Sequence, residues 1–141
     1  MKILVIDSSV IVKWLNQKDE ENMGKADQIL QDTRVGKIEL IAPELAKYEV
    51  GNVLLKGKQL TPQEADISVE TMYALPITFI TDSRDLSREA FLIAYNYGIT
   101  YYDASFLSLA KLYNATLVTA NAKHQGRAKD IDVVSLRDYQ L

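Results

Sequence analysis

Short runs of consecutive apolar residues alternate along this chain with longer segments in which apolar residues recur at every third or fourth position. The first run, residues 3–6, is partly β-branched, and such runs are typical of strands buried on both faces of a parallel sheet. Residues 10–15 then carry apolar side chains at helical spacing, and the polar residues 7–9 are of the types that begin helices. A strand, a polar turn and a helix are therefore predicted at the start of the chain.

The same alternation predicts the rest of the chain. Thr61, Pro62 and Glu64 form the clearest helix start, with a threonine cap, proline at the first helical position and glutamate three residues after the cap. Strands alternating with helices imply an α/β domain in which helices cover a mainly parallel sheet. Further strands are expected at residues 38–42, 77–80, 99–102, 116–119 and 132–134, and helices at residues 22–32, 43–56, 61–75, 83–97, 103–113 and 122–129.

Length and composition fit a single domain over residues 1–141, with 48% hydrophobic and 25% charged residues. The chain has no cysteine, which excludes a disulfide scaffold, a thiolate zinc site and a cysteine nucleophile. No apolar run approaches the roughly 18 residues of a membrane span, and the N-terminal run ends at Asp7, too early for a signal peptide. We therefore expect no membrane partner and a cytoplasmic location.

Charge leaves the question of a nucleic-acid partner open. The net charge of −3 is a weak argument against one, because phosphate binding usually requires a basic face. The 16 lysines and arginines still allow a local patch, and Lys123, Arg127 and Lys129 are equally compatible with RNA phosphate contacts and with a solvated face. His124, the single histidine, cannot form a histidine-rich zinc site and is expected on an exposed helix.

Acidic and amide side chains follow several of the predicted strands. Asp7 follows the first, Asp103 the fourth, and Asn121 comes two residues after the fifth, while Glu49 lies in the helix after the second. In open parallel sheets, function gathers at the carboxyl ends of the strands. Each residue also has a structural interpretation, because aspartate is a common N-cap and a helical glutamate is usually solvated.

Glu49 favours a functional interpretation, because its flanking residues are apolar. A carboxylate on an otherwise buried helix face needs a cation or a hydrogen-bond network. Acids that converge at one sheet edge repel one another and raise their pKa values, and a divalent ion removes that penalty. Ligands that are all oxygen favour Mg²⁺ or Mn²⁺.

Four segments, in order, resemble the motifs of the PIN domain family. They are residues 6–11 (IDSSVI), 48–54 (YEVGNVL), 102–110 (YDASFLSLA) and 117–121 (LVTAN). The segments span most of the chain, and the nearest likeness is to the VapC-type toxins of toxin–antitoxin pairs. The resemblance implies a three-layer α/β/α fold with a central, mainly parallel five-stranded sheet.

The resemblance also implies a function. It is that of a Mg²⁺- or Mn²⁺-dependent endoribonuclease, the toxin of a type II pair, which hydrolyses RNA phosphodiester bonds, forms a homodimer and is covered by a cognate antitoxin. By this match Ser9 is a hydroxyl that helps to hold a water beside the metal, and Asn52 and Thr119 are supporting polar positions. The catalytic residues implied by the match are Asp7, Glu49, Asp103, Ser9 and Asn121. The metal ligands implied by the match are Asp7, Glu49 and Asp103.

Asn121 departs from the family pattern, which usually has aspartate there. Asparagine offers a carbonyl oxygen but no charge, which weakens binding of a second metal. Asn121 therefore favours the alternative function, a catalytically weak or inactive RNA- or protein-binding module. Asp82 is not expected to substitute, because the family's strand order places the third strand at the sheet edge.

Other phosphoryl-transfer folds fit less well. A haloacid-dehalogenase-like phosphatase needs a second aspartate at Ser9, a response-regulator receiver needs an acidic pair near Asp7, and both leave Glu49 unexplained. The tyrosines at positions 95, 97, 101 and 102 are candidates for stacking on bases, although core or interface packing is the favoured interpretation.

Overall fold

The computed structural model describes residues 1–123 and 125–141. Within this part of the chain, five strands form one sheet in the order β3-β2-β1-β4-β5, and every pairing is parallel. The strands are β1 (Lys2–Ile6), β2 (Ile38–Pro43), β3 (Ile77–Ile80), β4 (Thr116–Thr119) and β5 (Val133–Ser135). The predicted α/β class with a parallel five-stranded sheet is confirmed.

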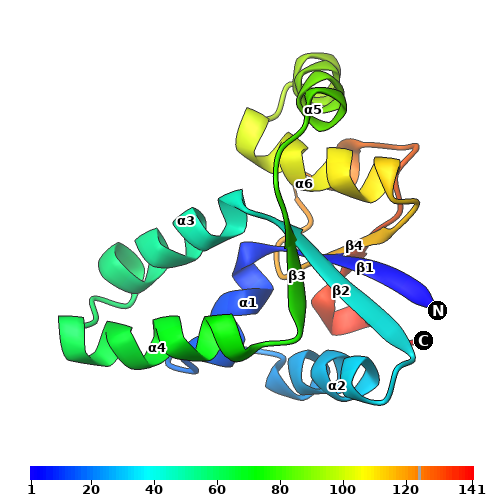
Figure 1. The fold of residues 1–141 in the computed structure, drawn as a ribbon. Helices are drawn as coiled ribbons and strands as arrows, with labels where there is room; N and C mark the ends of the chain where they lie inside the picture. The colour runs from blue at the N-terminus through cyan, green and yellow to red at the C-terminus, as the bar shows by residue number, and fades with distance from the viewer. Residues whose placement is uncertain (124) are drawn as a thin grey trace.

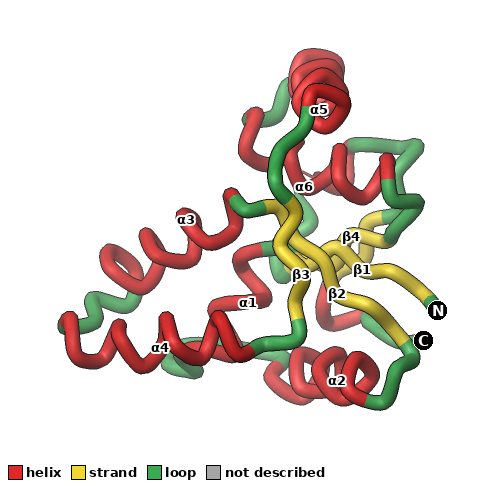
Figure 2. The backbone as a smooth tube through the Cα atoms, viewed as in Figure 1, coloured by secondary structure: helices red, strands yellow, loops and turns green. Residues whose placement is uncertain are grey.

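Helices cover both faces of the sheet (Figures 1 and 2). Helix α6 packs on β1, β2 and β4 with α5 on its outer side, whereas α1 and α2 lie on the other face. Helices α3 and α4 both extend away from the sheet, toward the left of the view (Figure 1). The helices are α1 (Ser8–Leu15), α2 (Met23–Arg34), α3 (Leu45–Asn52), α4 (Pro62–Ala74), α5 (Arg84–Tyr97) and α6 (Tyr101–Leu112).

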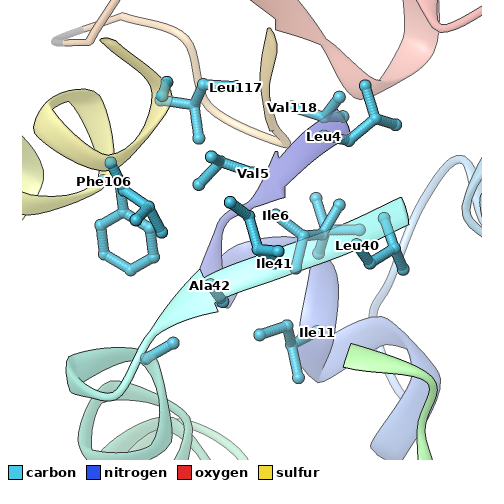
Figure 3. Close-up of a cluster of buried hydrophobic side chains, with 14 of the residues drawn as sticks. Leu4, Val5, Ile6, Ile11, Leu40, Ile41, Ala42, Phe106, Leu117 and Val118 are labelled. Carbon is cyan, nitrogen blue, oxygen red and sulfur yellow. The ribbon is translucent and has the colours of Figure 1, made fainter. Parts of the chain in front are cut away.

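The core lies where the central strands meet α1 and α6. Leu4, Val5 and Ile6 of β1 are all buried, as expected for a strand covered on both faces. Phe106 from α6 and Ile11 from α1 approach the sheet from opposite faces (Figure 3). Full burial of one such side chain stabilises the fold by roughly 1.5–3 kcal/mol. This core fixes the carboxyl ends of β1 and β4, which carry the candidate site.

Several predicted helix ends are confirmed. The Thr61 side chain accepts a hydrogen bond from the Glu64 N–H while the Glu64 side chain accepts one from the Thr61 N–H, which completes the capping box of α4. Ser83 caps α5, and Gly98 ends that helix with a φ of 64°, a left-handed conformation that glycine adopts readily.

The strand predicted at residues 99–102 is wrong. Thr100 is the N-cap of α6, and its Oγ1 accepts a hydrogen bond from the Asp103 N–H at 3.0 Å, so the helix already includes Tyr101 and Tyr102. The β-propensity of the tyrosines suggested a strand, but the Gly98 turn leads directly from α5 into the threonine cap. The fifth strand of the sheet is instead β5, close to the prediction at 132–134.

Two predicted helices are shorter in the structure. The helix expected over residues 43–56 is α-helical only from Leu45 to Asn52 and continues as the π-helical turn η1 (Val53–Gly57). The helix expected over residues 122–129 is reduced to the 3₁₀ turn η2 (Gln125–Arg127), and a second 3₁₀ turn, η3 (Leu136–Asp138), follows β5. The exposed helical position predicted for His124 lies outside the described residues.

None of the helices in residues 1–123 and 125–141 has the length and apolar character required to cross a membrane.

Candidate active site

Asp7 follows β1 at the carboxyl end of the sheet and is held by backbone and side chain together. Its N–H donates to the Val118 carbonyl at 3.1 Å, which extends the pairing of β1 with β4 by one residue. Its Oδ2 accepts hydrogen bonds from the Thr119 hydroxyl at 2.6 Å and the Ser9 hydroxyl at 3.1 Å. Two hydroxyls, one from each side, therefore fix the direction of this carboxylate.

Asp7 stands at the N-cap position of α1, but its side chain makes no capping hydrogen bond. The cap interpretation therefore does not account for the carboxylate. Burial raises the pKa of Asp7 above its ordinary value, the hydrogen bonds from Thr119 and Ser9 partly oppose the rise, and the negative charge of Asp103 adds to it.

Glu49 approaches the same region from α3. The buried Ser8 hydroxyl donates a hydrogen bond of 2.6 Å to Glu49 Oε1, which ties the first turn of α1 to α3. Burial raises the pKa of Glu49, the Ser8 hydrogen bond opposes the rise, and the charges of Asp7 and Asp103 add to it. Glu49 is half-buried, so the fully solvated interpretation is wrong.

Asp103 lies in the first turn of α6, three residues after the cap Thr100. Because the Thr100 hydroxyl caps the helix, the Asp103 carboxylate is not required for that purpose. Its charge raises the pKa values of both Asp7 and Glu49, so the three carboxylates act on one another across the site. The fold brings together acids from three separate segments.

No lysine or arginine neutralises these acids among the side chains that the structure describes. The ion pairs recorded there involve none of Asp7, Glu49 and Asp103. Within the same part of the chain, no three His, Cys, Asp or Glu side chains lie close enough together to hold an ion as they stand. Asp103 and Glu49 are each half-buried, so solvent reaches both side chains.

The donor chemistry fits a hard divalent cation. The three candidate ligands supply only carboxylate oxygens, which Mg²⁺ and Mn²⁺ prefer. The repulsion among the three carboxylates, which adds to the raised pKa values of Asp7 and Glu49, is an electrostatic penalty that a bound cation relieves.

Asn121 is connected to the site mainly through its backbone. Its N–H donates to Thr119 Oγ1 at 3.1 Å, and Thr119 is fully buried beside Asp7. The side-chain oxygen Oδ1 accepts the N–H of Lys123 at 3.3 Å, a local turn contact. The structure therefore uses the one side-chain oxygen of Asn121 for its own loop.

The structure also places three further residues considered from the sequence, Ser9, Asn52 and Asp82. Ser9 lies inside the hydrogen-bond network, since its Oγ also accepts the N–H of Ala120 at 3.1 Å. Asn52 is exposed and lines an adjacent cleft with Glu49. Asp82 follows β3, which β2 separates from β1 at the edge of the sheet, as expected.

Ser8 is the residue that sequence reasoning overlooked. It appeared only as one of three polar residues before a helix, whereas the structure makes it the hydrogen-bond donor to Glu49. The sequence did offer an indication that both serines contact site residues, because two adjacent hydroxyls follow Asp7. Neighbouring residues in a first helical turn point in different directions. Ser9 turns toward Asp7 and Ser8 toward Glu49.

The chain resembles several known proteins. A curated relative, Ribonuclease VapC3 from Pyrobaculum aerophilum, is 29% identical over 120 residues, which cover 82% of this chain and 87% of the relative. The toxin–antitoxin complex from Klebsiella pneumoniae contains a chain with a TM-score of 0.68 at 19% identity, covering 98% of this chain and 99% of that one. DNA-bound VapBC from Salmonella typhimurium gives a TM-score of 0.71 at 10% identity, covering 96% and 99%.

At such low identity, the two structural similarities establish the fold alone. The sequence itself matches the PIN domain family over residues 4–130, a span that includes all four motif segments. This chain therefore belongs to the PIN domain family.

Proposed function

We propose that this protein is a metal-dependent endoribonuclease that hydrolyses RNA phosphodiester bonds and acts as the toxin of a type II toxin–antitoxin pair. The carrying observation is that Asp103 lies near enough to Asp7 and Glu49 for its charge to raise their pKa values, with no basic partner for the three acids among the described side chains. The similarity to Ribonuclease VapC3 supports RNA as the substrate.

The roles of the residues follow from their contacts. Asp7 and Asp103 would hold Mg²⁺ or Mn²⁺ most directly, and Glu49 would act as a further ligand or through a water. The hydroxyls of Thr119 and Ser9 keep Asp7 Oδ2 in place, and Ser8 keeps Glu49 in place. A bound ion would polarise a phosphate oxygen and lower the pKa of the attacking water.

Partners follow from the family likeness. The Klebsiella pneumoniae and Salmonella typhimurium structures are toxin–antitoxin complexes, which supports a cognate antitoxin that covers the acidic edge. An arginine or lysine from that partner would pair with the acids. We further propose a homodimer in the cytoplasm, where a ribonuclease meets cellular RNA, with the exposed Lys123 and Lys129 beside the substrate.

A catalytically weak or inactive binding module is the second candidate. The observation that favours it is Asn121, whose side-chain oxygen is used by the local turn and which adds no charge to the site. The two candidates differ in a simple way, because the module requires neither metal binding nor RNA cleavage.

Calorimetric titration with Mg²⁺ and Mn²⁺, beside an RNA cleavage assay, separates these candidates. We expect the wild type to bind metal and to cleave, and Asp103→Asn to lose both. Absence of binding at millimolar metal together with absence of cleavage would sink the nuclease proposal. Binding without cleavage would favour the module, and Asn121→Asp would then test whether the missing charge is the defect.

A further inference from the structure

A cleft of about 250 Å³ opens directly beside the acidic site, between α3 and the start of α6. Leu45, Tyr48, Glu49 and Asn52 line one side and Tyr102 lines the other. The four α3 residues follow the i, i+3, i+4, i+7 spacing that places side chains on a single helix face. Glu49 belongs to both the cleft and the candidate metal site, so the two are continuous.

The two tyrosines of this cleft, Tyr48 and Tyr102, are mostly exposed to solvent, so packing in the core does not account for them. The side chain of Tyr48 is 77% exposed and that of Tyr102 is 60% exposed. Of the two uses favoured from the sequence, core packing is therefore wrong for Tyr102, and packing at an interface is an outcome of the test below. Each tyrosine immediately precedes a site carboxylate, Glu49 or Asp103, so the aromatic rings accompany the acids from both helices. Exposed aromatic groups beside a reactive site are typical of ligand contacts.

We infer that this cleft is a stacking subsite for one unpaired nucleobase next to the scissile phosphate. The inference rests on the proposed ribonuclease function and deepens it, because it makes single-stranded RNA the preferred substrate. Aromatic side chains stack on any base, and RNA in single strands exposes its base faces for such contacts.

The chemistry of the lining selects a base over the other parts of RNA. The described lining contains one carboxylate and no basic side chain, so it disfavours a phosphate group. Its volume lies just below the roughly 300–1,000 Å³ of pockets for drug-sized ligands, which suits a single flat ring system. The exposed Asn52 amide adds a donor and an acceptor at the rim for the edge of the base.

The test uses the full-length protein with Mg²⁺ and fluorescein-labelled 2′-O-methyl oligoadenylate, and gel electrophoresis after each titration checks that the probe is intact. Tyr48→Ala and Tyr102→Ala should each weaken binding at least about fivefold, whereas Tyr102→Phe, which keeps the ring, should bind as the wild type does. Tyr113→Ala is the matched control, since Tyr113 is 41% exposed and lies at the far end of the same helix, roughly 16 Å along its axis.

A second probe separates base stacking from general binding. The wild type should bind an oligomer of equal length that carries abasic spacers more weakly than it binds oligoadenylate. The alanine variants should bind this abasic oligomer as well as the wild type does. Metal binding by both variants, measured by calorimetry, should match the wild type.

Three results would overturn the subsite. One is unchanged oligoadenylate binding by both alanine variants, and another is an equal loss with the abasic oligomer. The third is a change in oligomeric mass in light scattering, which would assign the tyrosines to an interface between copies. Cleavage by the wild type tests the proposed function separately, so a wild type that cleaves while the alanine variants bind normally removes only the subsite. A wild type that binds neither oligomer removes the subsite, and only a wild type that also fails to cleave RNA removes the proposed function as well.

Discussion

Glu20 lies beside the C-terminal part of α1, and Asp7 and Glu49 lie at its N-terminal end. These acids have opposite kinds of hydrogen-bond partner. Glu20 accepts a hydrogen bond from Lys13 at 2.9 Å on one oxygen and from Lys58 at 2.6 Å on the other. Asp7 and Glu49, at the other end of α1, receive side-chain hydrogen bonds only from neutral hydroxyls among the described residues. Glu20 therefore has two cationic partners, whereas Asp7 and Glu49 have none among the described residues.

The pKa values follow that difference. Burial raises the pKa of Glu20, but the hydrogen bonds and charges of Lys58 and Lys13 outweigh it and leave the pKa below the ordinary value of 4.5. At Asp7 and Glu49 burial dominates, and the pKa of each is raised. Among the described residues, the carboxylate that joins segments of the chain has cationic partners, and the carboxylates of the candidate metal site have none. Such unbalanced acids are typical of functional sites.

The largest effect expected from this comparison is on catalysis. Asp103→Asn should lower kcat/KM at least about 100-fold, because loss of a metal ligand removes several kcal/mol of transition-state stabilisation. Glu20→Gln should leave kcat/KM unchanged, measured well below its melting temperature. Equal losses in the two variants would show that the distinction between paired and unpaired acids has no functional meaning.

The next effect is on stability, and it is expected in the Glu20 variant. Glu20→Gln should lower the free energy of unfolding by about 2 kcal/mol or more, because it leaves the buried Lys13 without its anionic partner. The contribution of Glu20 is present above its ordinary pKa of 4.5 and is lost as the pH falls through its lowered pKa. Urea unfolding at pH 7 and pH 3 measures both, and a difference between wild type and variant that is as large at pH 3 would contradict this assignment.

A smaller effect is expected at Ser8, the first residue of α1, which lies beside Asp7 and bonds to Glu49. Ser8→Ala removes the donor to Glu49 and should weaken Mn²⁺ binding about tenfold, the scale seen when a side chain that orients a ligand is removed. Ser8→Thr keeps the hydroxyl and should restore most of the affinity. Calorimetry checks both, and an alanine variant that binds Mn²⁺ like the wild type would show that Glu49 needs no such support.

The smallest effect is a gain in stability. Asp7→Asn should raise the free energy of unfolding in EDTA at pH 7 by about 0.5–2 kcal/mol, because the amide carries no charge to bury. The raised pKa means that the protonated Asp7 favours the folded state below pH 3.8, and this contribution is lost as the pH rises through the raised pKa.

The advantage of Asp7→Asn should therefore grow with pH and shrink when Mg²⁺ is added to the wild type. Differential scanning calorimetry across pH 3 to 8 follows it. A variant that is less stable than the wild type at every pH would show that the carboxylate at position 7 is structural.

The sequence was sufficient for most elements whose causes are local. Consecutive apolar residues predicted β1, and the Thr61 capping box predicted the start of α4. The failure at residues 99–102 came from tyrosines whose β-propensity a neighbouring turn and cap overrode. Four motif segments predicted the family, which the match over residues 4–130 confirmed. The metal-site assignment to Asp7, Glu49 and Asp103 remains a prediction.

By itself, then, the sequence determined most of the strands and helices, the family that they form and the acids that lie in its motif segments. Only the tertiary structure decided what each acid contacts. The partner of Glu49 is Ser8, 41 positions away, and that of Asp7 is Thr119, 112 positions away. The same holds for the cleft between α3 and α6. Local preferences act over a few residues, whereas these contacts exist only after burial of the core has brought distant segments together.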